Sequence, residues 1–154
     1  MGKEIERKFL VRDDSFRNLA EGVLIRQGYL VAGGLTSVRV RTMGDEAFLT
    51  VKGETIAASR DEYEYQIPTG DALEMIRELC EKPIIEKHRY LIDYKGYRWE
   101  IDEFHGMNEG LVVAEVELDS EDEAFEKPPW IGEEVTGDER YYNVNLVKNP
   151  FIRW

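Results

Sequence analysis

Charged side chains recur at every second position in several short segments of this sequence. Glu4, Glu6 and Lys8 are spaced in this way, and so are Arg39 and Arg41. Because successive side chains of a β-strand point to opposite faces, each of these sets would lie on one face of a strand. Like charges that lie side by side on a strand face are destabilising. The spacing therefore indicates that these side chains meet opposite charges, or a bound ligand.

The same spacing of like charges occurs in six of the eight strands that we expect. A single pair of this kind is usually a solvated strand face, but six such pairs predict a common charged surface. The intervening residues, such as Ile5, Val40 and Val116, are mostly apolar, so the opposite faces would pack against other elements. The charged surface would carry six basic residues, Lys8, Arg39, Arg41, Lys52, Lys87 and Arg89, and eight acidic ones, Glu4, Glu6, Glu62, Glu64, Glu100, Asp102, Glu115 and Glu117.

The two kinds of charge favour two kinds of ligand. Lysine and arginine bind phosphate oxygens, and arginine can do so with two parallel hydrogen bonds. Clustered carboxylates without cysteine and with little histidine suit a cation that prefers oxygen, such as Mg²⁺ or Mn²⁺. A surface rich in both signs predicts a site for a complex of metal and polyphosphate.

The expected secondary structure is mainly β-strand. Runs with alternating polarity, many of them separated by turn residues, predict strands at 3–11, 23–31, 37–42, 47–52, 60–67, 84–92, 97–103 and 111–118. Helices are expected at 14–20, 71–81 and 121–125, the second with Leu73, Ile76, Leu79 and Cys80 at helical spacing and with Thr69 or Asp71 as N-cap. Strands in hairpin-length succession predict an α+β but mainly β fold: an eight-stranded antiparallel barrel with a few peripheral helices. Helices or a homodimer partner would cover its apolar outer face.

Length and composition restrict the class of protein. The 154 residues suit a single domain, which we place at 1–154, and the formal net charge of −12 argues against a nucleic-acid partner and an anionic membrane surface. No run of apolar residues reaches the length of a membrane span or has the form of a signal peptide, so we expect a cytoplasmic protein. Cys80, the one cysteine, has no partner for an intramolecular disulfide and is expected in the core.

The ordered set of motifs resembles the CYTH family, also called triphosphate tunnel metalloenzymes. The segment Glu4-Ile5-Glu6-Arg7-Lys8 matches the ExExK signature of that family. The resemblance continues through VRVR (38–41), LTVKG (49–53), EYE (62–64), EKHRY (86–90), EIDEF (100–104), GL (110–111), AEVEL (114–118), TGD (136–138) and 141–146. ExExK alone is a weak pattern, whereas the ordered set is specific.

The resemblance implies a closed barrel that binds triphosphate groups in its interior. Its implied phosphate-binding residues are Lys8, Arg39, Arg41, Lys52, Lys87 and Arg89. Its implied metal-binding residues, for two Mg²⁺ or Mn²⁺ ions, are Glu4, Glu6, Glu64, Asp102, Glu115 and Glu117. Because phosphoryl transfer depends on positioning and charge neutralisation, we expect catalytic roles for Glu4, Glu6, Lys8 and Lys87.

Three functions are consistent with the sequence. The first is the metal-dependent hydrolysis of inorganic triphosphate to diphosphate and phosphate, with this small molecule as substrate and a homodimer as a possible assembly. The second is another reaction on the same scaffold: a thiamine- or nucleoside-triphosphatase or a class IV adenylate cyclase. The third is a module that binds polyphosphate or nucleotide without catalysis, but such a module is expected to have lost part of the acidic set, which is intact here.

Overall fold

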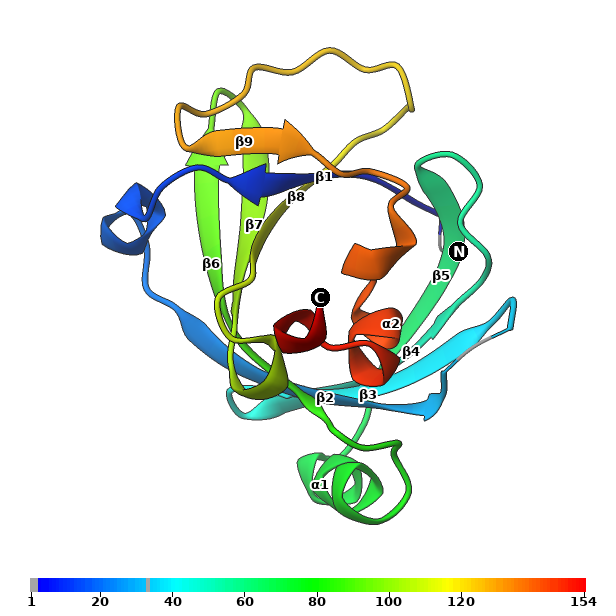
Figure 1. Ribbon diagram of the computed structural model, residues 1–154. Helices are drawn as coiled ribbons and strands as arrows, with labels where there is room; N and C mark the ends of the chain where they lie inside the picture. The colour runs from blue at the N-terminus through cyan, green and yellow to red at the C-terminus, as the bar shows by residue number, and fades with distance from the viewer. Residues whose placement is uncertain (1–2, 33) are drawn as a thin grey trace.

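The strands form a single antiparallel sheet that closes on itself (Figure 1). The computed structural model describes residues 3–32 and 34–154. Within these residues the strands follow the order β5-β4-β3-β2-β6-β7-β8-β1-β9. Their bounds are β1 Lys3–Val11, β2 Val23–Val31, β3 Ser37–Met43, β4 Glu46–Lys52, β5 Ser59–Gln66, β6 Ile85–Tyr94, β7 Tyr97–Phe104, β8 Val112–Glu117 and β9 Ile131–Glu134.

Strand β1 closes the barrel because it pairs with different neighbours along its length. Residues 3–5 pair with residues 59–61 of β5, and residues 6–10 pair with β8. The sheet from β5 round to β8 thus becomes an eight-stranded barrel, which confirms the predicted fold class. Strand β9 pairs with the far end of β1 and lies outside the ring (Figure 1).

Local sequence explains the tight hairpin between β6 and β7. Its two turn residues, Lys95 and Gly96, have φ values of 51° and 85°. Positive φ at both central positions gives a turn whose twist matches the right-handed twist of the strands. The hairpin holds Arg89 opposite Asp102 in the ladder, on the inner face of the barrel.

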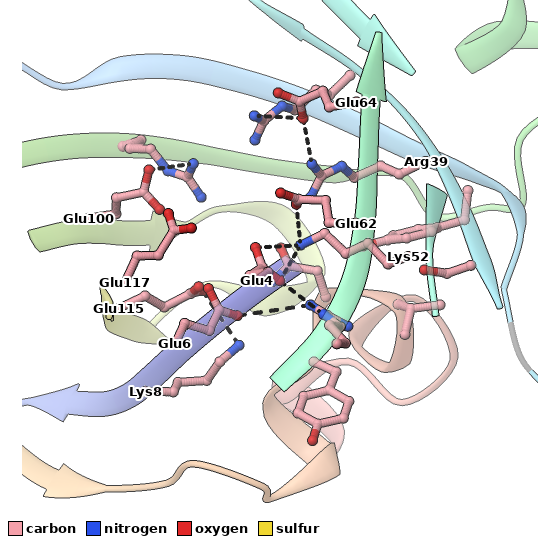
Figure 2. A pocket seen from close by; sticks show the side chains of 18 of the residues that line it. Glu4, Glu6, Lys8, Arg39, Lys52, Glu62, Glu64, Glu100, Glu115 and Glu117 are labelled. Atoms are coloured by element: carbon pink, nitrogen blue, oxygen red, sulfur yellow. Dashed lines mark hydrogen bonds and ion pairs between the residues drawn. The ribbon is translucent and has the colours of Figure 1, made fainter. Parts of the chain in front are cut away.

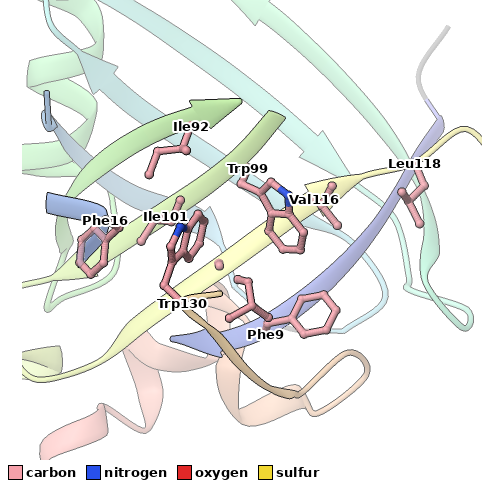
Figure 3. Close-up of a cluster of buried hydrophobic side chains, with 10 residues drawn as sticks. Phe9, Phe16, Ile92, Trp99, Ile101, Val116, Leu118 and Trp130 are labelled. Carbon is pink, nitrogen blue, oxygen red and sulfur yellow. The ribbon is translucent and has the colours of Figure 1, made fainter. Parts of the chain in front are cut away.

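The apolar faces of the strands point outward and are covered by the chain itself. Helix α1 (Thr69–Glu78) lies outside β2 and β3 (Figure 1), where Ala72 and Ile76 pack with Val40 and Ala47. On the side of β1, β7 and β8, a second cluster is built from aromatic and aliphatic residues (Figure 3): Phe9, Phe16, Ile92, Trp99, Ile101, Ala114, Val116, Leu118, Trp130 and Ile131. These two clusters need no partner subunit to cover them.

The C-terminal segment enters the ring of strands. Helix α2 (Asn143–Lys148) and the 3₁₀ helix η4 (Phe151–Arg153) lie inside the ring in the view along the barrel (Figure 1). Leu146 and Val147 belong to a buried cluster with Ile85 and Phe104. One end of the interior is therefore apolar and filled, while the remainder is charged.

Each predicted strand is present, with differences of at most two residues at the ends, whereas the helices depart more from expectation. The segment expected at 14–20 is the 3₁₀ helix η1 (Ser15–Asn18), and the helix expected at 71–81 is α1. The expected N-cap is wrong: Thr69 and Asp71 both lie inside α1, whose N-cap is Pro68 without a side-chain cap, and the Thr69 hydroxyl donates to the backbone oxygen of Asp45. Cys80 is buried, as expected.

The expected helix at 121–125 is wrong. The Glu123 side chain accepts a hydrogen bond from the Asp119 backbone nitrogen at 2.7 Å and another from the Tyr97 hydroxyl. These bonds fix a loop that leads to β9, and Phe125 of this loop packs against Phe9 and Trp99. The structure also adds β9 and α2, which the alternation of charge did not predict. No helix among the described residues has both the length and the apolar composition needed to cross a membrane.

Candidate active site

The interior of the barrel encloses a highly charged cavity of about 190 Å³ (Figure 2). Its lining includes seven basic side chains, Lys8, Arg39, Arg41, Lys52, Arg60, Lys87 and Arg89. It also includes seven carboxylates, Glu4, Glu6, Glu62, Glu64, Glu100, Glu115 and Glu117. Tyr29, Ser37, Tyr142, Asn143 and Val144 complete the lining.

Strand β1 contributes three of these charges through its alternation. Glu4 accepts hydrogen bonds from Lys52 Nζ at 3.2 Å and from Arg60 Nε at 3.0 Å. Lys8 Nζ lies 3.5 Å from Glu115 Oε1 of the neighbouring strand β8. Glu4 and Lys8 are both buried, and their ion pairs offset the cost of removing the charges from water.

Arg39 and Arg41 share one carboxylate. Each guanidinium places Nη2 3.5 Å from Glu64 Oε2, and Nε of each is buried without a hydrogen-bond partner. Burial, with Arg39 and Arg89 close by, lowers the pKa of Arg41 to about 10. A buried cation with a depressed pKa and a free donor is poorly neutralised. This side of the cavity therefore favours an anion.

Lys87 and Arg89 also depend on one carboxylate, that of Asp102. Lys87 Nζ lies 2.8 Å from Asp102 Oδ2, and Arg89 binds both oxygens of Asp102 at 2.8 and 2.9 Å. Burial, together with the nearby Arg89, lowers the pKa of Lys87 to about 7, although Asp102 opposes this shift. The same two cations hold the pKa of Asp102 below its usual value, against the effect of burial.

Four carboxyl groups of the cavity, those of Glu6, Glu62, Glu100 and Glu117, have raised pKa values. Burial and the adjacent Glu115 raise the pKa of Glu6 well above its ordinary value. Burial is also the main cause of raised pKa values at Glu62, Glu100 and Glu117, with further contributions from neighbouring carboxylates. Carboxyl groups that retain protons for want of a counter-charge favour a cation.

These oxygen donors fit a hard divalent cation. The raised pKa values mean that these carboxyl groups tend to keep their protons, and a bound metal ion would replace those protons. As placed, no three acidic, histidine or cysteine side chains within residues 3–32 and 34–154 converge closely enough to hold an ion. Binding would thus require the flexible glutamates to draw together.

Comparison with known proteins places this barrel in a family. The model of the CYTH domain matches residues 2–147. The chain belongs to the CYTH family. An inorganic triphosphatase of Acetivibrio thermocellus is 58% identical over 151 residues, which cover 98% of this chain and 97% of that protein. One of Nitrosomonas europaea is 44% identical over 149 residues, which cover 93% and 95%.

A solved CYTH-type structure supports the same relationship. The crystal structure of an inorganic triphosphatase superposes with a TM-score of 0.67 at 41% identity, and the match covers 93% of this chain and 96% of that one. The predicted resemblance to the CYTH family is therefore confirmed.

Nearly all residues that the sequence singled out line the cavity of this CYTH protein. All six predicted phosphate-binding residues are among them, as are Glu4, Glu6, Glu64, Glu115 and Glu117 from the predicted metal set. Asp102 is the exception: it is 2% exposed, is not part of the lining and serves Lys87 and Arg89 as their counter-ion. Its side chain is on the predicted inner face, but it lies behind Lys87 and Arg89 and does not reach the cavity.

Arg60, Tyr142 and Asn143 are among the lining residues of the CYTH barrel for which no role was predicted. Arg60 shares a strand face with Glu62 and Glu64, so alternation could have found it, but it differs from them in sign. Tyr142 and Asn143 lie outside any strand, and only the packing of α2 brings them to the cavity. The Tyr142 ring lies near both Lys8 Nζ, at 5.6 Å, and Arg60 Cζ, at 5.9 Å from its centroid.

The histidines lie away from the cavity, as alternation predicts for His88. His88 Nδ1 is 2.6 Å from His105 Nε2. Neither residue lines the charged interior of the CYTH barrel. Histidine is therefore not the acid–base group of this site.

Proposed function

We propose that this CYTH protein hydrolyses inorganic triphosphate to diphosphate and phosphate, with Mg²⁺ or Mn²⁺ as its cofactor. The observation that carries the proposal is that one enclosed cavity holds both arginines that share a single carboxylate and carboxyl groups with raised pKa values. Arg39 and Arg41 share the one carboxylate of Glu64, and burial together with the adjacent Glu115 raises the pKa of Glu6. A metal–triphosphate complex satisfies both requirements together. The relatives named inorganic triphosphatases support the same substrate.

The basic residues bind the phosphate groups in this proposal. Arg39 and Arg41 line the cavity and share the single carboxylate of Glu64, so their guanidinium groups have capacity for phosphate oxygens. Lys52 and Arg60 exchange part of their contact with Glu4 for the substrate. The binding set is Lys8, Arg39, Arg41, Lys52, Arg60, Lys87 and Arg89.

The glutamates hold the metal in this proposal. Glu4, Glu6, Glu64, Glu115 and Glu117 have the hard oxygen donors that Mg²⁺ and Mn²⁺ prefer. When bound, the ions supply charge neutralisation at the phosphate oxygens and acidify a coordinated water. Asp102 is left out of this set because both of its oxygens are held by Lys87 and Arg89.

The side chains of the protein promote the reaction by positioning the substrate and by neutralising charge. The bond between the terminal phosphorus and its bridging oxygen breaks with its electron pair on the diphosphate, a bond from that phosphorus to a water oxygen forms, and the proton that this water loses passes to solvent. Lys87 and Arg89 offset the negative charge that develops on the leaving diphosphate. Their shared partner Asp102 keeps both cations in place and is itself shielded from the cavity.

Phosphate release from a panel of triphosphates tests the proposal. Inorganic triphosphate, adenosine triphosphate and thiamine triphosphate are each incubated with Mg²⁺, with Mn²⁺ and with a chelator. We expect the highest kcat/KM for inorganic triphosphate and none in the chelator. A preference for either organic triphosphate, or formation of a cyclic nucleotide, would replace the proposed substrate. Binding without phosphate release would reject catalysis.

A further inference from the structure

The C-terminal segment brings one amide side chain into the charged cavity. Helix α2 lies within the ring of strands (Figure 1) because Leu146 and Val147 pack with Ile85 and Phe104. This packing fixes the first residue of the helix, Asn143, in the lining of the cavity.

Two hydrogen-bond donors meet at one atom of Asn143. Lys87 Nζ and Gln27 Nε2 each lie 2.9 Å from Asn143 Oδ1. When Lys87 carries its proton, its ammonium group donates hydrogen bonds and cannot accept them, so the Asn143 atom that faces it is then the carbonyl oxygen. The orientation of the amide therefore follows from the chemistry of Lys87, and the Asn143 Nδ2 group is directed away from both donors.

Gln27 is held in a way that stability does not explain. Its side chain is fully buried in β2, and its Oε1 atom has no hydrogen-bond partner. An unpaired buried acceptor destabilises a fold, and an apolar side chain of similar size would avoid that loss. The contact that Gln27 does make is the one with Asn143. Its role is thus to orient that amide.

The Asn143 Nδ2 group is free to bind an anion. Among the described residues, the hydrogen bonds of the Asn143 side chain are those made by its oxygen, so both N–H donors of Nδ2 lack a protein acceptor. The group lies in the same lining as Lys87, next to which negative charge is favourable. A negatively charged phosphate oxygen is the acceptor that suits the Nδ2 donors beside Lys87.

We propose that Asn143 binds a phosphate group of the substrate through Nδ2, and that Gln27 is the residue that positions it. This inference rests on the proposed function, since it assigns a further contact to the same triphosphate. Asn143 adds a directional hydrogen bond without adding charge, next to the ammonium group of Lys87. The C-terminal segment thereby takes a direct part in substrate binding.

A double-mutant cycle tests both roles. The variants are Asn143→Ala, Gln27→Met and the two combined, with Asn149→Ala as a control at the exposed end of the same helix. The dissociation constant of inorganic triphosphate is measured by calorimetry in a chelator, and KM and kcat are measured with Mg²⁺. Asn143→Ala should weaken binding about tenfold, the scale of a lost hydrogen bond to a charged group. Gln27→Met should weaken it in the same direction without lowering the melting temperature of the empty protein.

The combined variant separates positioning from independent effects. If Gln27 acts through Asn143, the combined variant should bind no more weakly than Asn143→Ala. Additive losses, or an unchanged dissociation constant in Asn143→Ala, would overturn the inference. Should Asn143→Ala not fold, Asn143→Asp keeps an oxygen for Lys87 and Gln27 but replaces the donor with a negatively charged acceptor; tight binding by that variant would also overturn it. A wild-type protein that neither binds nor hydrolyses triphosphate would instead refute the proposed function.

Discussion

Arg7 and Lys8 are consecutive residues of β1, yet their side chains lie on opposite sides of the barrel wall. Arg7 Nη2 donates to Glu134 Oε1 on the outside at 2.8 Å, whereas Lys8 Nζ faces Glu115 in the cavity at 3.5 Å. Lys8 is 6% exposed. Two neighbouring cations therefore provide a matched comparison between surface and site.

Glutamine at each of these positions tests whether the interior performs the chemistry. Lys8→Gln should lower kcat/KM for inorganic triphosphate by at least about tenfold, because a charged contact to phosphate is lost. Arg7→Gln should change it by less than about twofold, since exposed ion pairs contribute little. Steady-state kinetics of both variants gives the answer. Equal losses at the two positions would place the site elsewhere.

Arg41 should strengthen the binding of triphosphate but should not stabilise the ligand-free protein. Its guanidinium is buried beside Arg39, and the two share Glu64. We expect Arg41→Gln to weaken triphosphate binding about tenfold or more and to raise the melting temperature of the ligand-free protein, by roughly 2 °C or more per kcal/mol of relieved repulsion. Thermal unfolding and calorimetric binding measure the two effects.

The matched control for Arg41 is a cation on the outside of the barrel. Arg98 pairs with Asp93 in an exposed ion pair. Arg98→Gln should leave both the melting temperature and triphosphate binding near their wild-type values. A ligand-free Arg41→Gln protein that unfolds well below the wild type would contradict the expected repulsion.

Metal and triphosphate should stabilise the fold cooperatively. The metal neutralises carboxylates of the cavity and the triphosphate neutralises its basic residues, so the two together should raise the melting temperature more than either ligand alone. A ligand at a hundredfold excess over its Kd adds about 2.7 kcal/mol to the free energy of unfolding. Thermal unfolding with Mg²⁺, triphosphate, both, and both plus chelator measures this. An equal rise with sulfate, independent of metal, would indicate a nonspecific anion site.

The sequence was sufficient for the barrel because its charges alternate with strand periodicity. Glu4, Glu6 and Lys8 could be assigned to one face from spacing alone, and that face lines the cavity. Spacing gives the direction of a side chain but not its depth. Asp102 has the same direction as Glu100, yet it lies behind Lys87 and Arg89.

The contribution of the C-terminal segment was beyond such reasoning. Asn143 reaches the cavity because Leu146 and Val147 pack into the apolar end of the barrel, and no local pattern encodes that placement. The failed helix at 121–125 has a related cause. The contacts of Glu123 with Asp119 and with the distant Tyr97 favour a loop over helical hydrogen bonds.

The charge of Lys87 gives a pH dependence of known sign. Its pKa is lowered from 10.5 to about 7 by burial and by Arg89. Between these pH values the unfolded chain carries the Lys87 proton and the ligand-free folded protein does not. The free energy of unfolding should therefore gain a contribution from Lys87 as the pH rises from 7 to 10, by at most about 1.4 kcal/mol per pH unit, and lose it again as the pH falls to 7.

Subtraction isolates this contribution from other titrating groups. Urea unfolding in a chelator is followed from pH 7 to 10 for the wild type, for Lys87→Met and for Lys95→Met, which changes an exposed turn residue. The wild type should gain stability relative to Lys87→Met across this range, and Lys95→Met should follow the wild type. Bound triphosphate adds negative charge beside Lys87 and should restore its proton, so calorimetry at pH 8.5 in two buffers of different ionisation enthalpy should detect proton uptake by the wild type. A stability difference that stays constant with pH, together with binding that takes up no proton, would mean that Asp102 keeps Lys87 charged in the empty cavity.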